Sequence, residues 1–195
     1  MAVRKQKKTN PLPDEPITPI EMKKDNQNNV VLTGFMATGK STVGQLVAAK
    51  LDFEFIDTDD LIEMRWGKCI AEIFLEAGEQ AFRQKEGKVA AELGSRRGLV
   101  IATGGGMMQN PANVDAFNQH GQIYCLRASV ETILERIRKD KDGVRPLVQV
   151  DDPMRRIQAL MAERENVYAQ FIQLDTTGKT PKDVAAELLT IHGSK

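Results

Sequence analysis

A glycine-rich turn near the start of the chain constrains its fold more than any other feature of the sequence. Residues 34–41, hereafter the phosphate loop, read G-F-M-A-T-G-K-S and match the pattern G-x-x-x-x-G-K-[ST]. The apolar run 30–33 precedes this loop, and residues 41–51 after it have the apolar spacing of an amphipathic helix. A short apolar strand that enters a helix through such a turn is typical of a parallel α/β sheet.

The residue types of the loop suit the binding of phosphate groups, although a glycine-rich turn without a ligand is the alternative. Glycines let successive backbone N–H groups face phosphate oxygens, and the dipole of the following helix favours negative charge. Lys40 is expected to reach the β- and γ-phosphates of a nucleotide, and the Ser41 hydroxyl is a hard oxygen ligand for Mg²⁺. The expected nucleotide contacts are Gly34, Ala37, Thr38, Gly39, Lys40, Ser41 and Thr42.

Further apolar runs alternate with helical segments along the rest of the chain. Strands are expected at 53–56, 99–102, 123–126 and 171–174. Helices are expected at 61–93 with breaks near Gly67 and Gly78, from Pro111, and at 130–138, 154–168 and 181–191. This order predicts a three-layer α/β sandwich with a five-stranded parallel sheet, similar to the P-loop NTP hydrolases. In such sheets, ligands bind beyond the carboxyl ends of the strands.

The 195 residues are expected to form one domain, residues 29–195, behind a polar tail. Residues 1–28 hold a basic cluster and four prolines without an apolar run, so we expect disorder and no signal peptide. The 27 basic and 27 acidic residues balance, which excludes a general attraction to nucleic acid. Two cysteines and the lack of a long apolar run favour a reduced cytoplasmic protein without a membrane partner. We also expect a monomer.

Motifs beyond the phosphate loop narrow the class of protein. An N-K-x-D motif, typical of GTPases, does not occur, and neither do the H-R-D and D-F-G motifs of protein kinases. Acidic residues instead follow the second expected strand, as Asp57-Thr58-Asp59. The later motifs, in order, are F-R-Q-K-E at 82–86, G-G-G at 104–106, R-P-L at 145–147 and R-E-N-V-Y at 164–168.

This ordered set of motifs resembles the shikimate kinase family over residues 30 to about 190, with Ala37 where many members have glycine. The resemblance implies transfer of the γ-phosphoryl group of ATP to the 3-hydroxyl of shikimate, in chorismate and aromatic amino acid biosynthesis. It implies ATP as co-substrate and Mg²⁺ as the metal. Asp57 would hold Mg²⁺ through a water, and Asp59 would bind the acceptor hydroxyl and take its proton.

The resemblance also assigns residues to the acceptor, to the lid and to the adenine. Arg83 and Arg164 would bind the substrate carboxylate, and a Gly105 N–H group, flanked by Gly104 and Gly106, would also donate to the substrate. Arg145, in a lid at about 139–152, would act on the phosphates and complete a catalytic set with Lys40 and Asp59. Arg138, or the alternative Arg136 two residues earlier, and Lys179 would lie at the adenine.

The residues by themselves leave other readings open. Asp59 could cap a helix that begins at Leu61, although Asp60 is the better cap. Arg83 could pair with Glu79 or Glu86 on an exposed helix face. Non-functional alternatives also exist for the other residues. Arg164 could be a surface charge, residues 104–106 could form a tight turn without a ligand, and Arg138, Arg145 and Lys179 could be solvated charges. Two other functions fit the motifs less well, a kinase for another polyol acid such as gluconate and a non-catalytic sensor.

Overall fold

The computed structural model describes residues 28–139 and 152–193. The expected lid and almost all of the expected tail therefore lie outside the described residues. The described chain has seven α-helices and five strands, with one or two helices after each strand and one 3₁₀ turn at Met107–Gln109. No helix in these ranges is long and apolar enough to cross a membrane.

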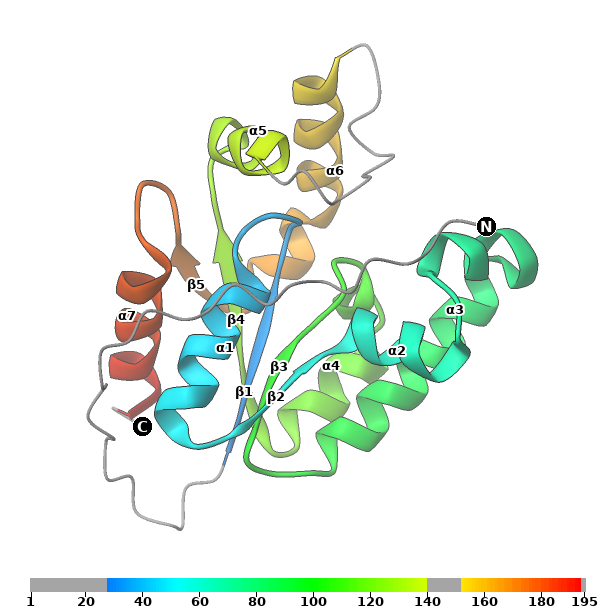
Figure 1. Cartoon of the computed structure of the whole chain (residues 1–195), viewed down its shortest axis with the longest axis horizontal. Coiled ribbons are helices and arrows are strands. Elements are labelled where there is room, and N and C mark those ends of the chain that lie inside the picture. The colour runs from blue at the N-terminus through cyan, green and yellow to red at the C-terminus, as the bar shows by residue number, and fades with distance from the viewer. Residues whose placement is uncertain (1–27, 140–151, 194–195) are drawn as a thin grey trace.

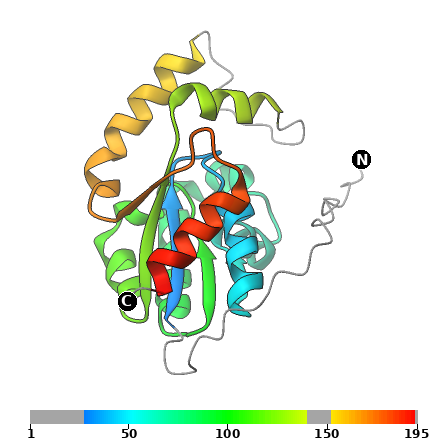
Figure 2. The same ribbon diagram turned by 90° about the vertical axis from the view of Figure 1, so that its left-hand side faces the viewer.

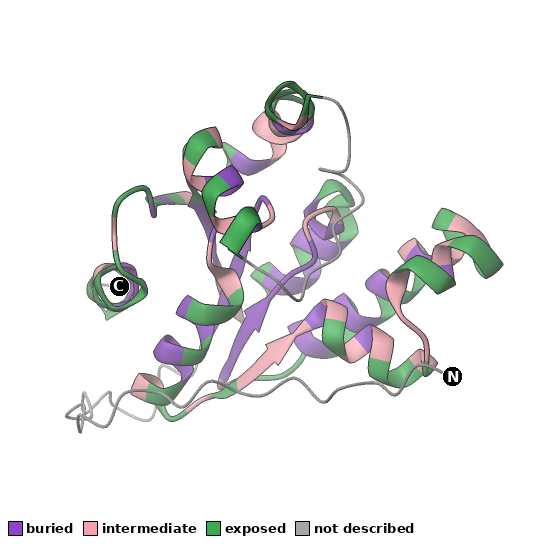
Figure 3. Cartoon of the chain, turned by 45° about the horizontal axis from the view of Figure 1, so that its top comes forward, coloured by how far each residue is buried: buried purple, intermediate pink, exposed green. Residues whose placement is uncertain are grey.

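The five strands form one parallel sheet, as the sequence predicted. They are β1 (Asn29–Gly34), β2 (Glu54–Asp57), β3 (Leu99–Ala102), β4 (Gly121–Arg127) and β5 (Ile172–Asp175). Their spatial order is β2-β3-β1-β4-β5, so β1 lies in the centre and pairs with β3 and β4. The central strands are fully buried, as their continuous apolar runs require (Figure 3).

Helices cover both faces of this sheet and one of its ends (Figures 1 and 2). They are α1 (Lys40–Leu51), α2 (Thr58–Trp66), α3 (Ile70–Gly94), α4 (Pro111–Asn118), α5 (Val130–Lys139), α6 (Pro153–Tyr168) and α7 (Pro181–Gly193). Helices α1 and α7 share a hydrophobic core on one face, and α3 and α4 share another on the opposite face. A third core joins α5 and α6 to Phe35 beyond the carboxyl end of β1.

The long segment expected to be helical at 61–93 is divided where the glycines predicted. Gly67 ends α2 in the left-handed region at φ 70°, and Gly78 kinks α3 at φ 78°. The expected start of this segment was wrong, because α2 begins at Thr58 directly after β2. Its N-cap is Asp57, whose Oδ1 accepts a 3.0 Å hydrogen bond from the N–H of Asp59. Neither Asp59 nor Asp60 is therefore the cap.

Candidate active site

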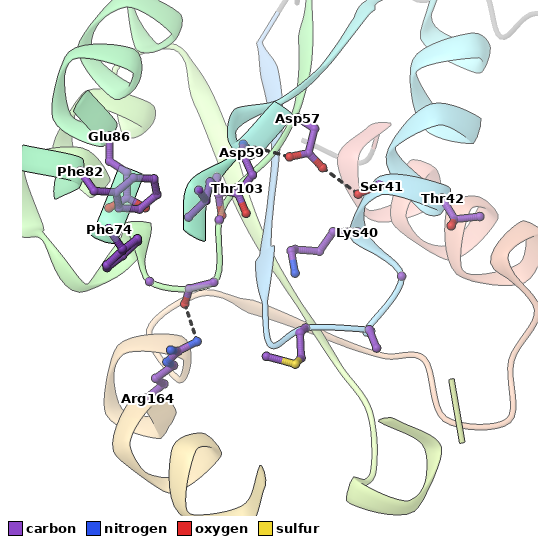
Figure 4. Close-up of a pocket in the computed structure, with 17 residues that line it drawn as sticks. Lys40, Ser41, Thr42, Asp57, Asp59, Phe74, Phe82, Glu86, Thr103 and Arg164 are labelled. Atoms are coloured by element: carbon purple, nitrogen blue, oxygen red, sulfur yellow. Dashed lines mark hydrogen bonds between the residues drawn. The ribbon is translucent and has the colours of Figure 1, made fainter. Parts of the chain in front are cut away.

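A cavity of about 560 Å³ lies at the carboxyl ends of the strands, where the sheet topology predicts a ligand. The phosphate loop forms one side, and the glycine turn at 104–106 forms another (Figure 4). Asp57 and Asp59 lie between these two sides. Arg164 reaches the cavity from α6, and apolar side chains of α3 complete the wall. One cavity thus joins residues from five separate motifs of the sequence.

The phosphate loop connects β1 to α1 and curls around the Lys40 ammonium group. Lys40 Nζ donates to the carbonyl oxygens of Gly34 at 3.0 Å and Phe35 at 2.9 Å. Gly34 has φ 131°, and a Cβ atom there would lie 2.2 Å from the Leu126 carbonyl oxygen, so only glycine fits. Ala37 is left-handed at φ 57°, a conformation that costs a non-glycine residue about 1 kcal/mol.

The Ser41 and Asp57 side chains meet beside the start of α1. Ser41 Oγ donates a 2.8 Å hydrogen bond to Asp57 Oδ2. A hydroxyl and a carboxylate are hard oxygen donors, and Mg²⁺ takes few protein ligands besides water and phosphate. Within the described ranges, no group of three or more His, Cys, Asp or Glu side chains could hold a metal. Because Mg²⁺ takes most of its ligands from water and phosphate, this hydroxyl and carboxylate suit Mg²⁺ that is carried by a nucleotide.

The Asp59 carboxyl group is largely buried between the phosphate loop and the glycine turn. Burial, together with the nearby negative charge of Asp57, raises its pKa to about 7, while the Lys40 ammonium opposes this shift. A Cβ atom on Gly104 would lie 2.4 Å from Asp59 Oδ1. The N–H of Gly104 donates to Thr58 Oγ1 at 2.9 Å and fixes the turn against α2. Asp59 is thus poised to exchange a proton near neutral pH.

The other two glycines of the turn lie against the two expected carboxylate ligands. A Cβ atom on Gly105 would lie 3.0 Å from Arg164 Nη1, and one on Gly106 would lie 2.7 Å from Arg83 Nη1. Arg164 Nη1 donates to the Gly105 carbonyl oxygen at 3.0 Å. Its buried Nε has no hydrogen-bond partner within the described ranges. The absence of side chains on the turn therefore lets two guanidinium groups approach its backbone closely.

Arg83 makes both ion pairs that its helical spacing allowed. Its Nη2 lies 2.9 Å from Glu79 Oε1, and its Nη1 lies 2.7 Å from Glu86 Oε2. Glu86 is 1% exposed and lines the cavity. Burial raises the pKa of Glu86, whereas the Arg83 guanidinium lowers it. The ion-pair reading of Arg83 was therefore correct in geometry. Its partner Glu86 lines the cavity, whereas Arg83 itself does not.

Glu86 is a cavity residue that the sequence reasoning did not select. The sequence contained a signal that could have identified it. Glu86 has the helical spacing of the buried stripe of α3, which contains Phe82, Val89 and Leu93. A carboxylate in an apolar stripe needs a buried partner, and Arg83 lies one turn before it. The apolar wall of Ile70, Phe74 and Phe82 was not selected either.

Four other predicted residues, Gly34, Thr38, Arg138 and Lys179, do not line the active-site cavity. Lys179 and Arg136 line a second cavity of about 360 Å³ with Thr38, Gly39 and Thr42. Lys179 also pairs with Glu187 at 2.6 Å.

Arg138 is not brought to that second cavity. It lines a different hollow on α5, beside Glu131, Leu134, Glu135, Lys139 and Met154. Arg136, which was the alternative to Arg138, donates to the Ala37 and Thr176 carbonyl oxygens at 3.1 and 2.8 Å. Arg145 lies outside the described residues.

Comparisons with known proteins agree with the motifs. A sequence model of the family described as shikimate kinase matches residues 36–192. A shikimate kinase of Caldanaerobacter subterraneus subsp. tengcongensis is 46% identical over 166 residues, which cover 84% of this chain and 95% of that protein. A shikimate kinase of Geobacter sulfurreducens is 45% identical over 163 residues, which cover 83% and 89%.

Solved structures extend this similarity to the fold. A shikimate kinase from Acinetobacter baumannii, solved in complex with shikimate, has a TM-score of 0.78 and 37% identity. The match covers 86% of this chain and 93% of that one. A gluconokinase from Sinorhizobium meliloti has a TM-score of 0.58 at 15% identity, a similarity that concerns the fold alone.

Proposed function

The chain belongs to the shikimate kinase family and is an ATP-dependent kinase that phosphorylates shikimate, and we propose that the 560 Å³ cavity is where it does so. One observation carries this proposal. The phosphate loop, the largely buried Asp59 carboxyl and the Arg164 side chain line the same cavity, and Arg83 lies against Gly106 of its glycine turn. A phosphoryl donor and an anionic acceptor could both bind there, on opposite sides of Asp59.

The phosphate loop receives the ATP phosphates. Its backbone N–H groups and the start of α1 bind them, and Lys40 exchanges its carbonyl partners for phosphate oxygens. Ser41 and Asp57 would hold Mg²⁺, directly through the hydroxyl and through a water at the carboxylate. The ion, when bound, neutralises charge that develops on the phosphates. We propose that Arg145 contacts the ATP phosphates and that Arg138 and Lys179 contact the adenine.

Asp59 acts on the acceptor hydroxyl. Its carboxylate accepts a hydrogen bond from the 3-hydroxyl of shikimate and takes the proton as the oxygen attacks the γ-phosphorus. A base with a pKa of about 7 is half ionised at neutral pH, so it can accept this proton and release it again. The backbone of Gly104 lies close against the Asp59 carboxyl group and limits its movement.

The two arginines bind the carboxylate of shikimate. Arg83 and Arg164 both lie against the glycine turn, and Arg164 also lines the cavity. Guanidinium offers paired donors that fit a carboxylate and stays charged at every physiological pH. The Gly105 N–H would add a hydrogen bond to the ring substituents.

We also propose that residues 29–195 act as a single domain, as a cytoplasmic monomer.

ADP release measured with and without shikimate tests this proposal. The full chain with MgATP should produce ADP only when shikimate is added, and gluconate at the same concentration should give no increase. ADP release that depends on gluconate would refute the acceptor assignment. Tight ATP and shikimate binding without any ADP release would instead identify a sensor.

A further inference from the structure

The Gly105 carbonyl oxygen accepts two hydrogen bonds from α6. One comes from Arg164 Nη1 at 3.0 Å, and the other comes from the Tyr168 hydroxyl at 2.7 Å. The two donors are four residues apart, so they lie on the same face of the helix. Tyr168 itself is buried, at 7% exposure, and its hydroxyl reaches 63 residues back along the chain. Such a long-range bond ties the end of α6 to the glycine turn.

These bonds set the orientation of the backbone in the turn. The Gly104 carbonyl accepts from the Met107 N–H at 3.1 Å, and the Gly105 carbonyl is held by α6. No peptide bond in the described chain is cis, so each N–H points opposite to the carbonyl of its own peptide unit. The N–H groups of Gly105 and Gly106 are therefore directed away from these partners. Glycine has the widest range of backbone conformations and loses the most entropy when it is fixed, so a glycine turn depends on such bonds for a single orientation.

We propose that Tyr168 is a positioning residue for the acceptor, because its hydroxyl fixes the Gly105 carbonyl that orients both the glycine turn and Arg164. This proposal rests on the proposed function, since it concerns how that cavity binds shikimate. Tyr168 does not line the cavity and would not touch the substrate. Its effect passes through the Gly105–Gly106 peptide unit and through the shared acceptor to the Arg164 guanidinium.

The substitution Tyr168→Phe removes only the hydroxyl, and the chain supplies a matched control. Its second tyrosine, Tyr124, is fully buried on the α1 and α7 face, where its hydroxyl lies 3.0 Å from His192 Nδ1. Tyr168→Phe leaves the Gly105 carbonyl bonded to Arg164, so little stability should be lost. Tyr124→Phe should lower the melting temperature at least as much, but it is remote from the cavity.

Steady-state kinetics of both variants distinguishes positioning from simple packing. Tyr168→Phe should raise the KM for shikimate about five- to tenfold, as expected for one lost hydrogen bond, and leave the KM for ATP unchanged. Tyr124→Phe should change neither KM. An unchanged KM for shikimate in Tyr168→Phe, or an equal rise for both substrates, would overturn the proposal. If the wild-type chain lacks shikimate-dependent ADP release, this result refutes the proposed function itself. A wild-type chain that releases ADP while Tyr168→Phe keeps its KM for shikimate refutes only the role of Tyr168.

A double-mutant cycle tests the route through Arg164. Arg164→Lys retains the charge and loses the planar fork, and it should also raise the KM for shikimate. If both side chains act through Gly105, the double variant should raise this KM by less than the product of the two single effects. A rise equal to that product would mean independent roles and would contradict the proposal.

Discussion

Asp57 bonds to Ser41 through one carboxylate oxygen and caps α2 through the other. Oδ2 accepts from the Ser41 hydroxyl at 2.8 Å, and Oδ1 accepts from the N–H of Asp59 at 3.0 Å. The same side chain therefore sets the geometry of the expected metal site and the start of the helix that holds Asp59. A substitution that removes the charge of Asp57 but keeps a capping side chain can therefore separate its role at the metal site from its role in α2.

The substitution Asp57→Asn makes this separation. Asparagine caps helices as well as aspartate does, so the melting temperature should change little. The neutral amide is a poor ligand partner for Mg²⁺, and the Mg²⁺ concentration for half-maximal activity should rise about tenfold. The matched control is Asp60→Asn, which alters an exposed carboxylate three residues away. Equal Mg²⁺ requirements in the two variants would remove Asp57 from the metal site.

The raised pKa of Asp59 predicts how activity depends on pH. A base with a pKa of about 7 is protonated and inactive in acid, so kcat/KM for shikimate should fall as pH drops through about 7. Asp59→Asn should lower kcat by about 10²-fold and remove this limb of the profile. A wild-type profile that stays flat from pH 5 to about 8 would contradict a role for Asp59 as base.

The same shift predicts an effect on stability. The folded chain keeps its Asp59 proton up to a pH of about 7, whereas an unfolded aspartate loses it near its ordinary value of 3.8. The stability that Asp59 contributes is thus full below pH 3.8 and is lost as pH rises through about 7. Asp59→Asn should therefore raise the melting temperature at alkaline pH, by roughly 5 °C, and have little effect in acid. Calorimetry of both proteins across this range measures the difference.

Much of the fold could be predicted from the sequence, because the apolar runs of a parallel sheet are short and continuous. All five strands and the glycine breaks in the 61–93 segment were found within a few residues. The start of α2 could not be found, because β2 passes into the helix without a loop and three neighbouring carboxylates compete as caps. Capping depends on backbone angles that a run of aspartates does not reveal.

The sequence could predict the motif residues of the candidate site but not the contacts that orient them. The structure brings the acidic pair and most of the predicted phosphate-loop residues into one cavity, although Gly34 and Thr38 do not line it. The contacts that orient them join distant parts of the chain, as Tyr168 and Gly105 do across 63 residues. Periodicity within one helix also could not tell that Glu86, the partner of Arg83, lines a cavity, because helix spacing gives the same ion pair on a surface.

Arg83→Ala tests the acceptor side of the cavity. Loss of this guanidinium should raise the KM for shikimate about 10²-fold and leave the KM for ATP unchanged. It should also lower the melting temperature by a few degrees, because the buried Glu86 carboxylate loses its counter-charge. Arg65→Ala is the control, since Arg65 makes an equally close pair with Glu92, but that pair is exposed. An unchanged KM for shikimate in Arg83→Ala would remove the carboxylate role.

Gly104→Ala tests whether close approach, rather than chain flexibility, explains the glycine turn. The new methyl group would lie 2.4 Å from Asp59 Oδ1, a distance that forces the carboxyl group to move. Because Asp59 must meet the acceptor hydroxyl, kcat should fall about 10²-fold, since small displacements of a reacting group are costly. The control is Gly87→Ala in α3, where the nearest atom would lie 3.7 Å away and alanine favours the helix. Gly87→Ala should keep full activity and melt slightly higher. Full activity in Gly104→Ala would mean that Asp59 tolerates displacement, and its position against the turn would then have no part in catalysis.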